Sequence, residues 1–153
     1  MTNNNNDLKK VTNLDYLVDL SKGNTQFVKE MIDTFLAENP KEIESLEKAI
    51  QTKNFEAIKQ TAHLLQSSIP FVGLDKIIES EVYEIEKIAV DKTVIKKIEI
   101  VHADKSEIQK IEIQSADKPS LQKIELLFSK VKEACENARQ ELKDSEHHQL
   151  SPK

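Results

Sequence analysis

Glycine is scarce in this chain, since only Gly23 and Gly73 occur among its 153 residues. A β-sandwich or barrel needs a turn roughly every 8–12 residues, and glycine adopts turn conformations most readily. Charged residues make up 32% of the chain and aromatic residues 5%, which is typical of long solvated helices around a core of Leu, Ile and Val. The sequence therefore predicts an all-α fold, and the chain is long enough for one domain with a hydrophobic core.

Apolar residues recur at intervals of three and four along most of the chain, which predicts amphipathic helices. Asn13, Asn24 and Asn54 precede three of these apolar stripes and are typical N-terminal caps. Pro40 allows two interpretations, because it can open a new helix at its first turn or kink a helix that continues. Pro119 suits the first turn of the last helix. The expected helices cover residues 14–21, 25–51, 55–68, 74–89 and 119–144.

Three similar segments interrupt this pattern. They begin at Asp91, Asp104 and Asp117 and therefore repeat every 13 residues. In one straight helix this period turns the apolar face by about 220° per copy, so the copies cannot share a face without a turn or a kink. A kinked helical hairpin and a β-hairpin both stay open as interpretations. Ser106 and Gln109, which are spaced as in a capping box, favour the helix.

The composition also excludes several classes of function. The net charge of −5 argues against binding to nucleic acid, which requires a basic surface. Cys135 is the single cysteine, so no disulfide can form within the chain, and its place on an apolar stripe predicts a buried thiol. No apolar segment is long enough to cross a membrane, and the Asn-rich residues 1–10 differ from a signal peptide. We therefore expect a cytoplasmic protein.

His63 is the residue that most strongly suggests chemistry. Ala62 belongs to the buried stripe of its helix, and His63 lies about 100° around the helix from Ala62. The neighbours of His63 on its own side are polar or small, namely Gln60, Gln66 and Ser67. The spacing therefore predicts an imidazole that is exposed to solvent in the middle of a regular helix.

A histidine in this position can accept a phosphoryl group. An exposed imidazole is mostly neutral near pH 7, and the neutral form is the nucleophile. It is also accessible to a second protein that carries an aspartyl phosphate. A small residue one turn away leaves room for that partner, and a side-chain donor at the i+3 position, here Gln66, can donate a hydrogen bond to the phosphoryl oxygens.

The segment around His63 resembles the signature of histidine phosphotransfer (HPt) domains, in which His-x-Leu-Lys-Gly-Ser is followed by a glycine ten residues after the histidine. The corresponding residues here are His63, Leu65, Gln66, Ser67, Ser68 and Gly73. The resemblance covers residues 14–88 well and the last helix acceptably, whereas the repeats look like an insertion. It implies an antiparallel four-helix bundle with the acceptor histidine exposed on the second bundle helix.

The resemblance also implies a function in a two-component phosphorelay. His63 would reversibly accept a phosphoryl group from the aspartate of a response-regulator receiver domain, or exchange it with a hybrid histidine kinase. Gln66 and Ser67 would orient the phosphoryl group, Gln60 and Leu64 would contact the partner, and Gly73 would be structural. The chain would need no metal or cofactor of its own, because the divalent metal would come with the receiver. Without a nucleotide-binding motif, it would be a carrier rather than a kinase.

Two residues depart from the family pattern. Gln66 replaces a lysine and brings no positive charge, and Ser67 replaces a glycine and allows a less close approach. A second interpretation is therefore kept, in which the chain is a non-catalytic helical module that docks a receiver or another partner without phosphotransfer. His102, His147 and His148 have no partners at metal-binding spacing, so we expect a surface position for the first and a polar tail for the other two.

The sequence thus predicts one domain with a tail at each end. Residues 1–11 are expected to be a disordered tail, because they are polar and lack a hydrophobic stripe. Residues 12–144 are expected to form the helical bundle, with the insertion at 91–118, and residues 145–153 a polar tail.

Overall fold

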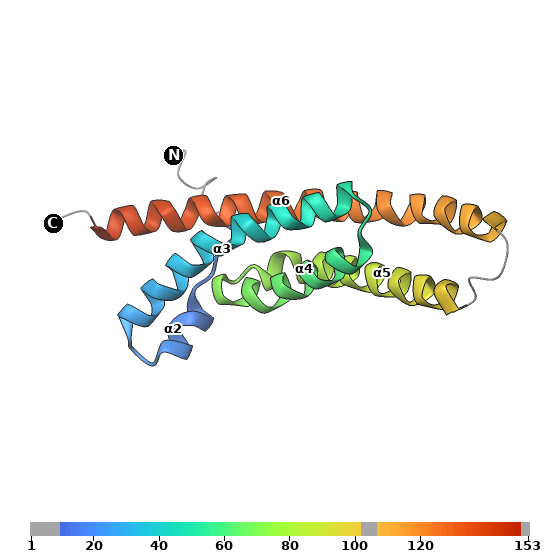
Figure 1. The fold of residues 1–153 in the computed structure, drawn as a ribbon. Coiled ribbons are helices and arrows are strands. Elements are labelled where there is room, and N and C mark those ends of the chain that lie inside the picture. Colours follow the sequence, from blue (N-terminus) through green and yellow to red (C-terminus); the bar gives the residue numbers. More distant parts are fainter. Residues whose placement is uncertain (1–9, 102–106, 151–153) are drawn as a thin grey trace.

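The computed structural model describes residues 10–101 and 107–150, with side chains over 10–94 and 118–145. Within the described residues all regular elements are helices, which confirms the all-α prediction (Figure 1). The elements are α2 (Asp15–Ser21), α3 (Thr25–Gln51), α4 (Phe55–Ser68), the 3₁₀ helix η1 (Ile69–Val72), α5 (Asp75–Val101) and α6 (Glu107–Leu150). The predictions for residues 1–9 and for His102 lie outside the described residues, as do those for the side chains of His147 and His148.

The four longer helices pack around a common core. α3 contacts α4 and α6, and α5 contacts the same two helices. The stripe predicted on the last helix is buried at all its positions, which are Leu121, Ile124, Phe128, Val131, Cys135, Ala138 and Leu142. The apolar spacing on α5 predicts a buried face that includes Ile77, and this prediction is wrong at Ile77, whose exposed fraction is 39%. No described helix has both the length and the apolar character that a membrane span requires.

Asparagine side chains fix the starts of three helices. The Oδ1 atom of Asn24 accepts a hydrogen bond from the backbone N–H of Phe27 at 3.0 Å, and Asn54 does the same for Ala57 at 3.1 Å. Asn13 accepts from the backbone N–H of Asp15 at 2.9 Å. Each of these bonds satisfies a donor that a helix N-terminus leaves unpaired. The predicted caps Asn24 and Asn54 are therefore confirmed, and so is the predicted range of α4. The prediction for Asn13 is wrong by one residue, because α2 begins at Asp15 and Leu14 occupies its N-cap position.

Two prolines lie inside helices. α3 continues through Pro40, so the interpretation in which a new helix opens there is wrong. Pro119 also lies inside its helix rather than in the first turn, because α6 already begins at Glu107. An interior proline costs about 3 kcal/mol, since it removes a hydrogen bond and crowds the preceding turn. Packing of α6 against α5 and α3 offsets that cost.

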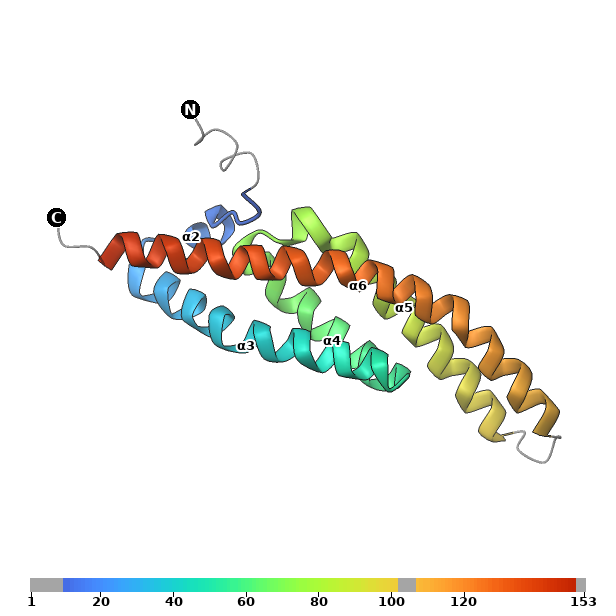
Figure 2. The same cartoon turned by 90° about the horizontal axis from the view of Figure 1, so that it is seen from above.

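The last two helices are longer than the sequence predicted. α5 runs to Val101 rather than to residue 89, since no glycine or proline interrupts it, and α6 reaches Leu150 rather than residue 144. The backbones of the repeats that begin at Asp91 and Asp104 are helical wherever the structure describes them, which excludes the β-hairpin. In two perpendicular views α5 and α6 extend side by side beyond α3 and α4 (Figures 1 and 2).

The segment before α2 is fixed to both α6 and η1. The Glu141 carboxylate accepts hydrogen bonds from the backbone N–H groups of Val11 and Thr12 at 2.9 and 3.0 Å. The Asn13 N–H donates to the carbonyl of Val72 at 2.9 Å. A Cβ atom on Gly73 would lie 2.5 Å from the Asn13 oxygen, and Gly73 has a φ of +79°. Only glycine therefore fits where the chain crosses itself.

Candidate functional site

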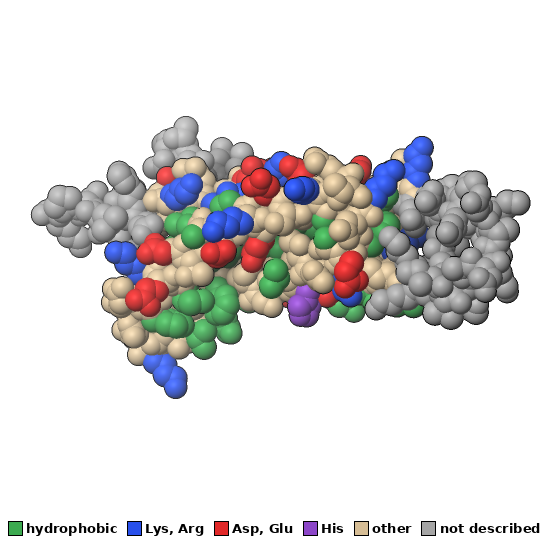
Figure 3. Space-filling model, viewed as in Figure 1, with side chains coloured by type: hydrophobic (Ala, Val, Ile, Leu, Met, Phe, Trp, Pro, Cys, Tyr) green, Lys and Arg blue, Asp and Glu red, His purple; other side chains and the backbone are tan. Residues whose placement is uncertain are grey.

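His63 projects from the middle of α4 into solvent. Its side chain is 68% exposed, whereas Ala62 and Leu65 are fully buried on the inner side of the helix. His63 is the one histidine whose side chain lies in the described part of the chain, and Figure 3 shows this histidine at the surface. The predicted exposure is therefore confirmed, and a second macromolecule can reach the imidazole.

Glu86 on α5 contacts the imidazole from the side. Its Oε2 atom lies 2.9 Å from Nδ1 of His63, and the Glu86 side chain is only 19% exposed. The other carboxylate oxygen, Oε1, accepts a hydrogen bond from the side-chain amide of Gln66. One carboxylate thus joins His63 and Gln66, which lie one turn apart on α4, to the neighbouring helix.

The contact with Glu86 selects one tautomer of the neutral imidazole. A carboxylate can only accept hydrogen bonds, so the Nδ1 atom must carry the proton. In the neutral ring Nε2 is then unprotonated, and its lone pair is available for reaction. A partner that holds the other ring nitrogen is the usual way in which a protein fixes the tautomer of a reactive histidine.

The other predicted site residues lie near His63, but two of them have local partners. The Ser67 hydroxyl donates to the backbone carbonyl of His63 at 3.4 Å, so it does not point toward the ring. The Gln60 amide donates to Glu56 at 3.4 Å. Leu64 has no such restraint to a polar group and is 55% exposed beside His63. The face around the imidazole therefore combines polar side chains with one exposed aliphatic side chain.

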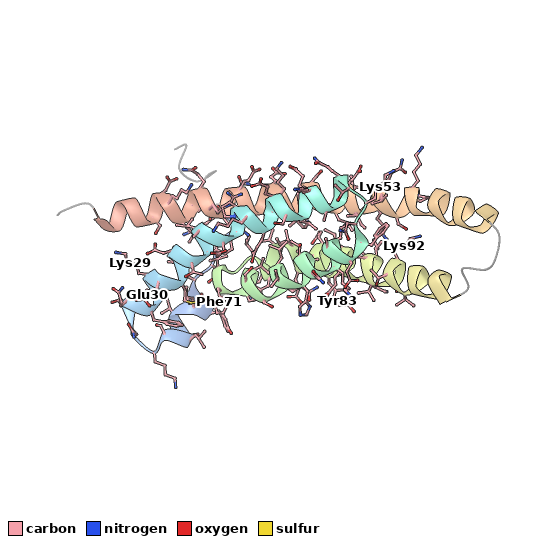
Figure 4. All side chains as sticks on the ribbon, in the orientation of Figure 1. Lys29, Glu30, Lys53, Phe71, Tyr83 and Lys92 are labelled. Carbon is pink, nitrogen blue, oxygen red and sulfur yellow. The ribbon has the colours of Figure 1, made fainter. Side chains whose placement is uncertain are left out.

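A shallow pocket of about 260 Å³ begins one turn from His63. Its lining combines apolar and acidic side chains, and consists of Gln66, Ile69, Pro70, Asp75, Glu79 and Tyr83. Tyr83 is 58% exposed, and Figure 4 shows it on the same side of the molecule as Phe71. His63 borders this pocket only through Gln66, so the pocket is not a cavity around the imidazole.

The sequence did not indicate Glu86 as a partner of His63. Glu86 follows Val82 by four residues and Ile85 by one, which places it at the edge of the buried stripe of α5. That position indicates a residue close to another helix. The local pattern does not say which helix faces this edge of α5, nor which residue of that helix lies opposite Glu86. Both depend on how α4 and α5 pack.

Comparison with protein families gives one match. Residues 30–87 match the family model described as Hpt domain. The matched range includes most of α3, all of α4 and the first part of α5, and with them His63, Gln66 and Glu86. Neither the curated proteins nor the solved structures contain a match to the chain.

Proposed function

Because residues 30–87 of this chain belong to the Hpt domain family, we propose that His63 reversibly accepts a phosphoryl group from a receiver-domain aspartate and passes it on in a phosphorelay. Hpt domains are phosphoryl carriers of two-component signalling and not kinases. The observation that supports His63 as the acceptor is its exposed imidazole, with Nδ1 held by Glu86 at 2.9 Å.

In the proposed transfer the lone pair on Nε2 attacks the phosphorus of the aspartyl phosphate. The N–P bond forms, the bond between phosphorus and the aspartate oxygen breaks, and its electron pair leaves with the aspartate carboxylate. The Nδ1 proton stays on the ring, where Glu86 accepts its hydrogen bond. The ring gains positive charge during this step, and the adjacent carboxylate stabilises that charge. The reverse sequence returns the group to a receiver.

Gln66 and Ser67 are proposed to orient the phosphoryl group. Each would exchange its present partner for a phosphoryl oxygen: Gln66 now donates to Glu86 and Ser67 to the carbonyl of His63. The contact from Ser67 is long, at 3.4 Å, so little is lost when it breaks. Ser67 can therefore turn to the phosphoryl group at little cost, whereas Gln66 would have to give up its hydrogen bond to the Glu86 carboxylate.

The proposed partners are receiver domains or a hybrid histidine kinase. Leu64, exposed beside His63, and Gln60 are proposed to contact them. The divalent metal that phosphoryl transfer requires would be bound by the receiver, and the chain itself would need no cofactor. The cytoplasmic location expected from the sequence remains part of this proposal.

The finer fold assignment belongs to the same proposal. We assign α3, α4, α5 and α6 to the four helices of an antiparallel Hpt bundle, which the contacts among them support. In this assignment α4, with His63, is the second bundle helix. The repeats around residues 91–118 would then be an insertion that lengthens α5 and α6, and this agrees with a family match that ends at residue 87.

Direct phosphorylation tests the proposal. The chain is incubated with several phosphorylated receiver domains, and we expect an acid-labile, alkali-stable phosphate on the wild-type chain. His63→Gln should abolish the label, whereas the matched control His102→Gln, which removes a different histidine, should keep it. An unlabelled wild-type chain, or a label that survives His63→Gln, contradicts the proposal.

Non-catalytic docking is the second candidate function. It is favoured by one observation, namely that the neutral Gln66 is bound to Glu86 and offers no cation to a phosphoryl group. In this case His63→Gln would leave both receiver binding and cellular output intact. Phosphotransfer instead requires that output be lost while binding persists, so the same variant separates the two functions.

A further inference from the structure

Lys59, His63 and Gln66 form one stripe along α4. They are spaced at i, i+4 and i+7, which places them on the same side of a helix. His63 and Gln66 both contact Glu86, so this stripe borders α5. The Lys59 side chain is 27% exposed, which agrees with a position at the same border. Lys59 is also the only lysine in α4, which contains no arginine.

The side chains of Glu86 and Glu56 make the surroundings of His63 acidic, so a phosphoryl group there would need a cation to neutralise its charge. Glu86 contacts the ring on one side, and Glu56 lies two turns before His63 on α4. A phosphoryl group on Nε2 would add close to two further negative charges to this face. Gln66, at the position where the family has lysine, cannot neutralise this charge. The Lys59 ammonium is now 2.9 Å from Oε1 of Glu56.

We propose that Lys59 is the cation that pairs with the phosphoryl group on His63, a role that rests on the proposed function. Side chains four apart on a helix have Cβ atoms only about 5–6 Å apart, and the flexible stem of lysine spans that gap. The Cα–Cβ bonds of a helix tilt toward its N-terminus, so the His63 side chain leaves the backbone on the side of the turn that carries Lys59. Lys59 can leave Glu56 at a modest cost, since an i, i+3 pair with a solvent-exposed carboxylate is weak.

The position of the cation distinguishes this site from the family pattern. A lysine at i+3 lies on the Gln66 side of the histidine, where the pocket begins. Lys59 instead lies one turn before the histidine, at i−4. Glu56 holds its ammonium in the unphosphorylated chain, so phosphorylation exchanges one anionic partner of Lys59 for another.

Replacement of Lys59 by methionine tests this role, because it removes the charge and keeps the stem. The measurement is the equilibrium between phosphorylated receiver and phosphorylated His63. We expect Lys59→Met to shift it toward the receiver by about three- to tenfold, as for a partly solvated charge-assisted hydrogen bond. Lys59→Arg should stay near wild type. Adding Gln66→Lys to Lys59→Met should restore the equilibrium, because it supplies a cation at i+3.

Lys41 provides a matched control. It forms the same i, i+3 pair with Glu38 on another helix, at 3.8 Å, and its side chain is 72% exposed. Lys41→Met and Lys59→Met therefore lose the same charge and the same kind of pair. Lys87→Met removes a charge from α5 next to Glu86 and tests for a general effect of net charge. Both controls should change the equilibrium by less than about twofold.

The salt dependence adds a readout that a purely structural role would not change. In wild type, added salt should weaken phosphoryl retention on His63, and Lys59→Met should flatten this dependence. Circular dichroism and thermal unfolding should match between Lys59→Met and Lys41→Met. If wild type takes the label but Lys59→Met behaves like Lys41→Met or Lys87→Met, the role of Lys59 is wrong and the carrier function stands. If wild type takes no label, both proposals fail.

Discussion

The Oε2 atom of Glu86 lies 2.9 Å from the Nδ1 atom of His63, and the two residues come from different helices. The contact therefore depends on the packing of α4 against α5. It holds the Nδ1 atom of a ring whose side chain is 68% exposed. Glu86 on α5 thus determines which ring nitrogen of His63 on α4 is available for reaction, although 22 residues of chain separate the two.

Replacement of Glu86 should slow phosphorylation of His63. Glu86→Ala removes the acceptor of the Nδ1 proton, so the neutral ring is no longer biased toward the tautomer with a free Nε2. We expect the rate of transfer from a phosphorylated receiver to fall about tenfold or more, given the usual contribution of a positioned polar group. Nitrogen NMR of the imidazole should show a smaller fraction of the Nδ1–H tautomer in the variant.

Glu84 provides the control for Glu86. It lies on the other side of the same helix, where its carboxylate pairs with Lys123 of α6 at 3.3 Å. Glu84→Ala should leave both the transfer rate and the tautomer ratio near wild type. Equal rates for the Glu86 and Glu84 variants would show that the contact with His63 has no part in transfer.

Short-range features of this fold could be predicted from the sequence. Asn54 caps α4 and the apolar spacing from Phe55 onward fixes its buried side, so both the helix and the outward direction of His63 depend on residues close in sequence. The same holds for the final apolar stripe that contains Cys135. These features are local, and local propensity and periodicity determine them.

Features that depend on packing between helices were not predicted. The contact of Glu86 with His63 is one, and the position of Pro119 inside α6 is another. In isolation Pro119 favours a helix start, and only the packing against α5 and α3 offsets its cost in the interior. Gly73 was expected to be structural, but the reason is the Asn13 backbone that crosses it, which no local pattern contains.

Replacement of Gly73 by alanine should destabilise the fold. The new Cβ atom would lie 2.5 Å from the Asn13 oxygen, and the residue would have to keep a φ of +79°. We expect a loss of at least about 2 kcal/mol in the free energy of unfolding, from backbone strain and displacement of the segment before α2. Urea unfolding followed by circular dichroism measures this loss.

Gly23→Ala is the matched control for Gly73→Ala. Gly23 has a similar φ of +87°, but its added Cβ would meet no atom within 4 Å other than those of its own residue and its two chain neighbours. At Gly23 the substitution costs only the strain of a positive φ, so we expect the free energy of unfolding to fall by about 1 kcal/mol. If the two variants lose the same stability, the close approach of Asn13 makes no contribution.

Cys135 should be unreactive in the folded chain. Burial raises the pKa of its thiol to about 11, and the hydrogen bond from the Asn39 amide at 3.5 Å offsets only part of this effect. At pH 8 about one thiol in a thousand is then ionised, and the sulfur is also fully buried. We expect labelling by a thiol reagent at pH 8 to be at least about a hundredfold slower in the folded chain than in urea. Rapid labelling of the folded chain would contradict the burial of Cys135.

Glu42 should make the stability of the chain depend on pH in an unusual direction. Burial raises the pKa of this carboxyl above 4.5, although a hydrogen bond from Ser68 opposes the change and the charge of Glu38 adds to it. The folded state therefore binds the proton more tightly than the unfolded state. The stability that this group contributes is present at low pH and is lost as the pH rises through the raised pKa. At pH 7 the ionised carboxylate thus destabilises the fold.

Replacement of Glu42 by glutamine tests this direction, because it removes the charge and keeps the shape of the side chain. We expect Glu42→Gln to raise the free energy of unfolding at pH 7 by up to about 1 kcal/mol, and this gain to disappear as the pH falls to 4.5 and below. Glu44→Gln, at an exposed position two residues on, is the control and should show no such pH-dependent gain. A Glu42→Gln variant that is less stable than wild type at pH 7, or equally stabilised at every pH, would contradict the destabilising role of the Glu42 charge.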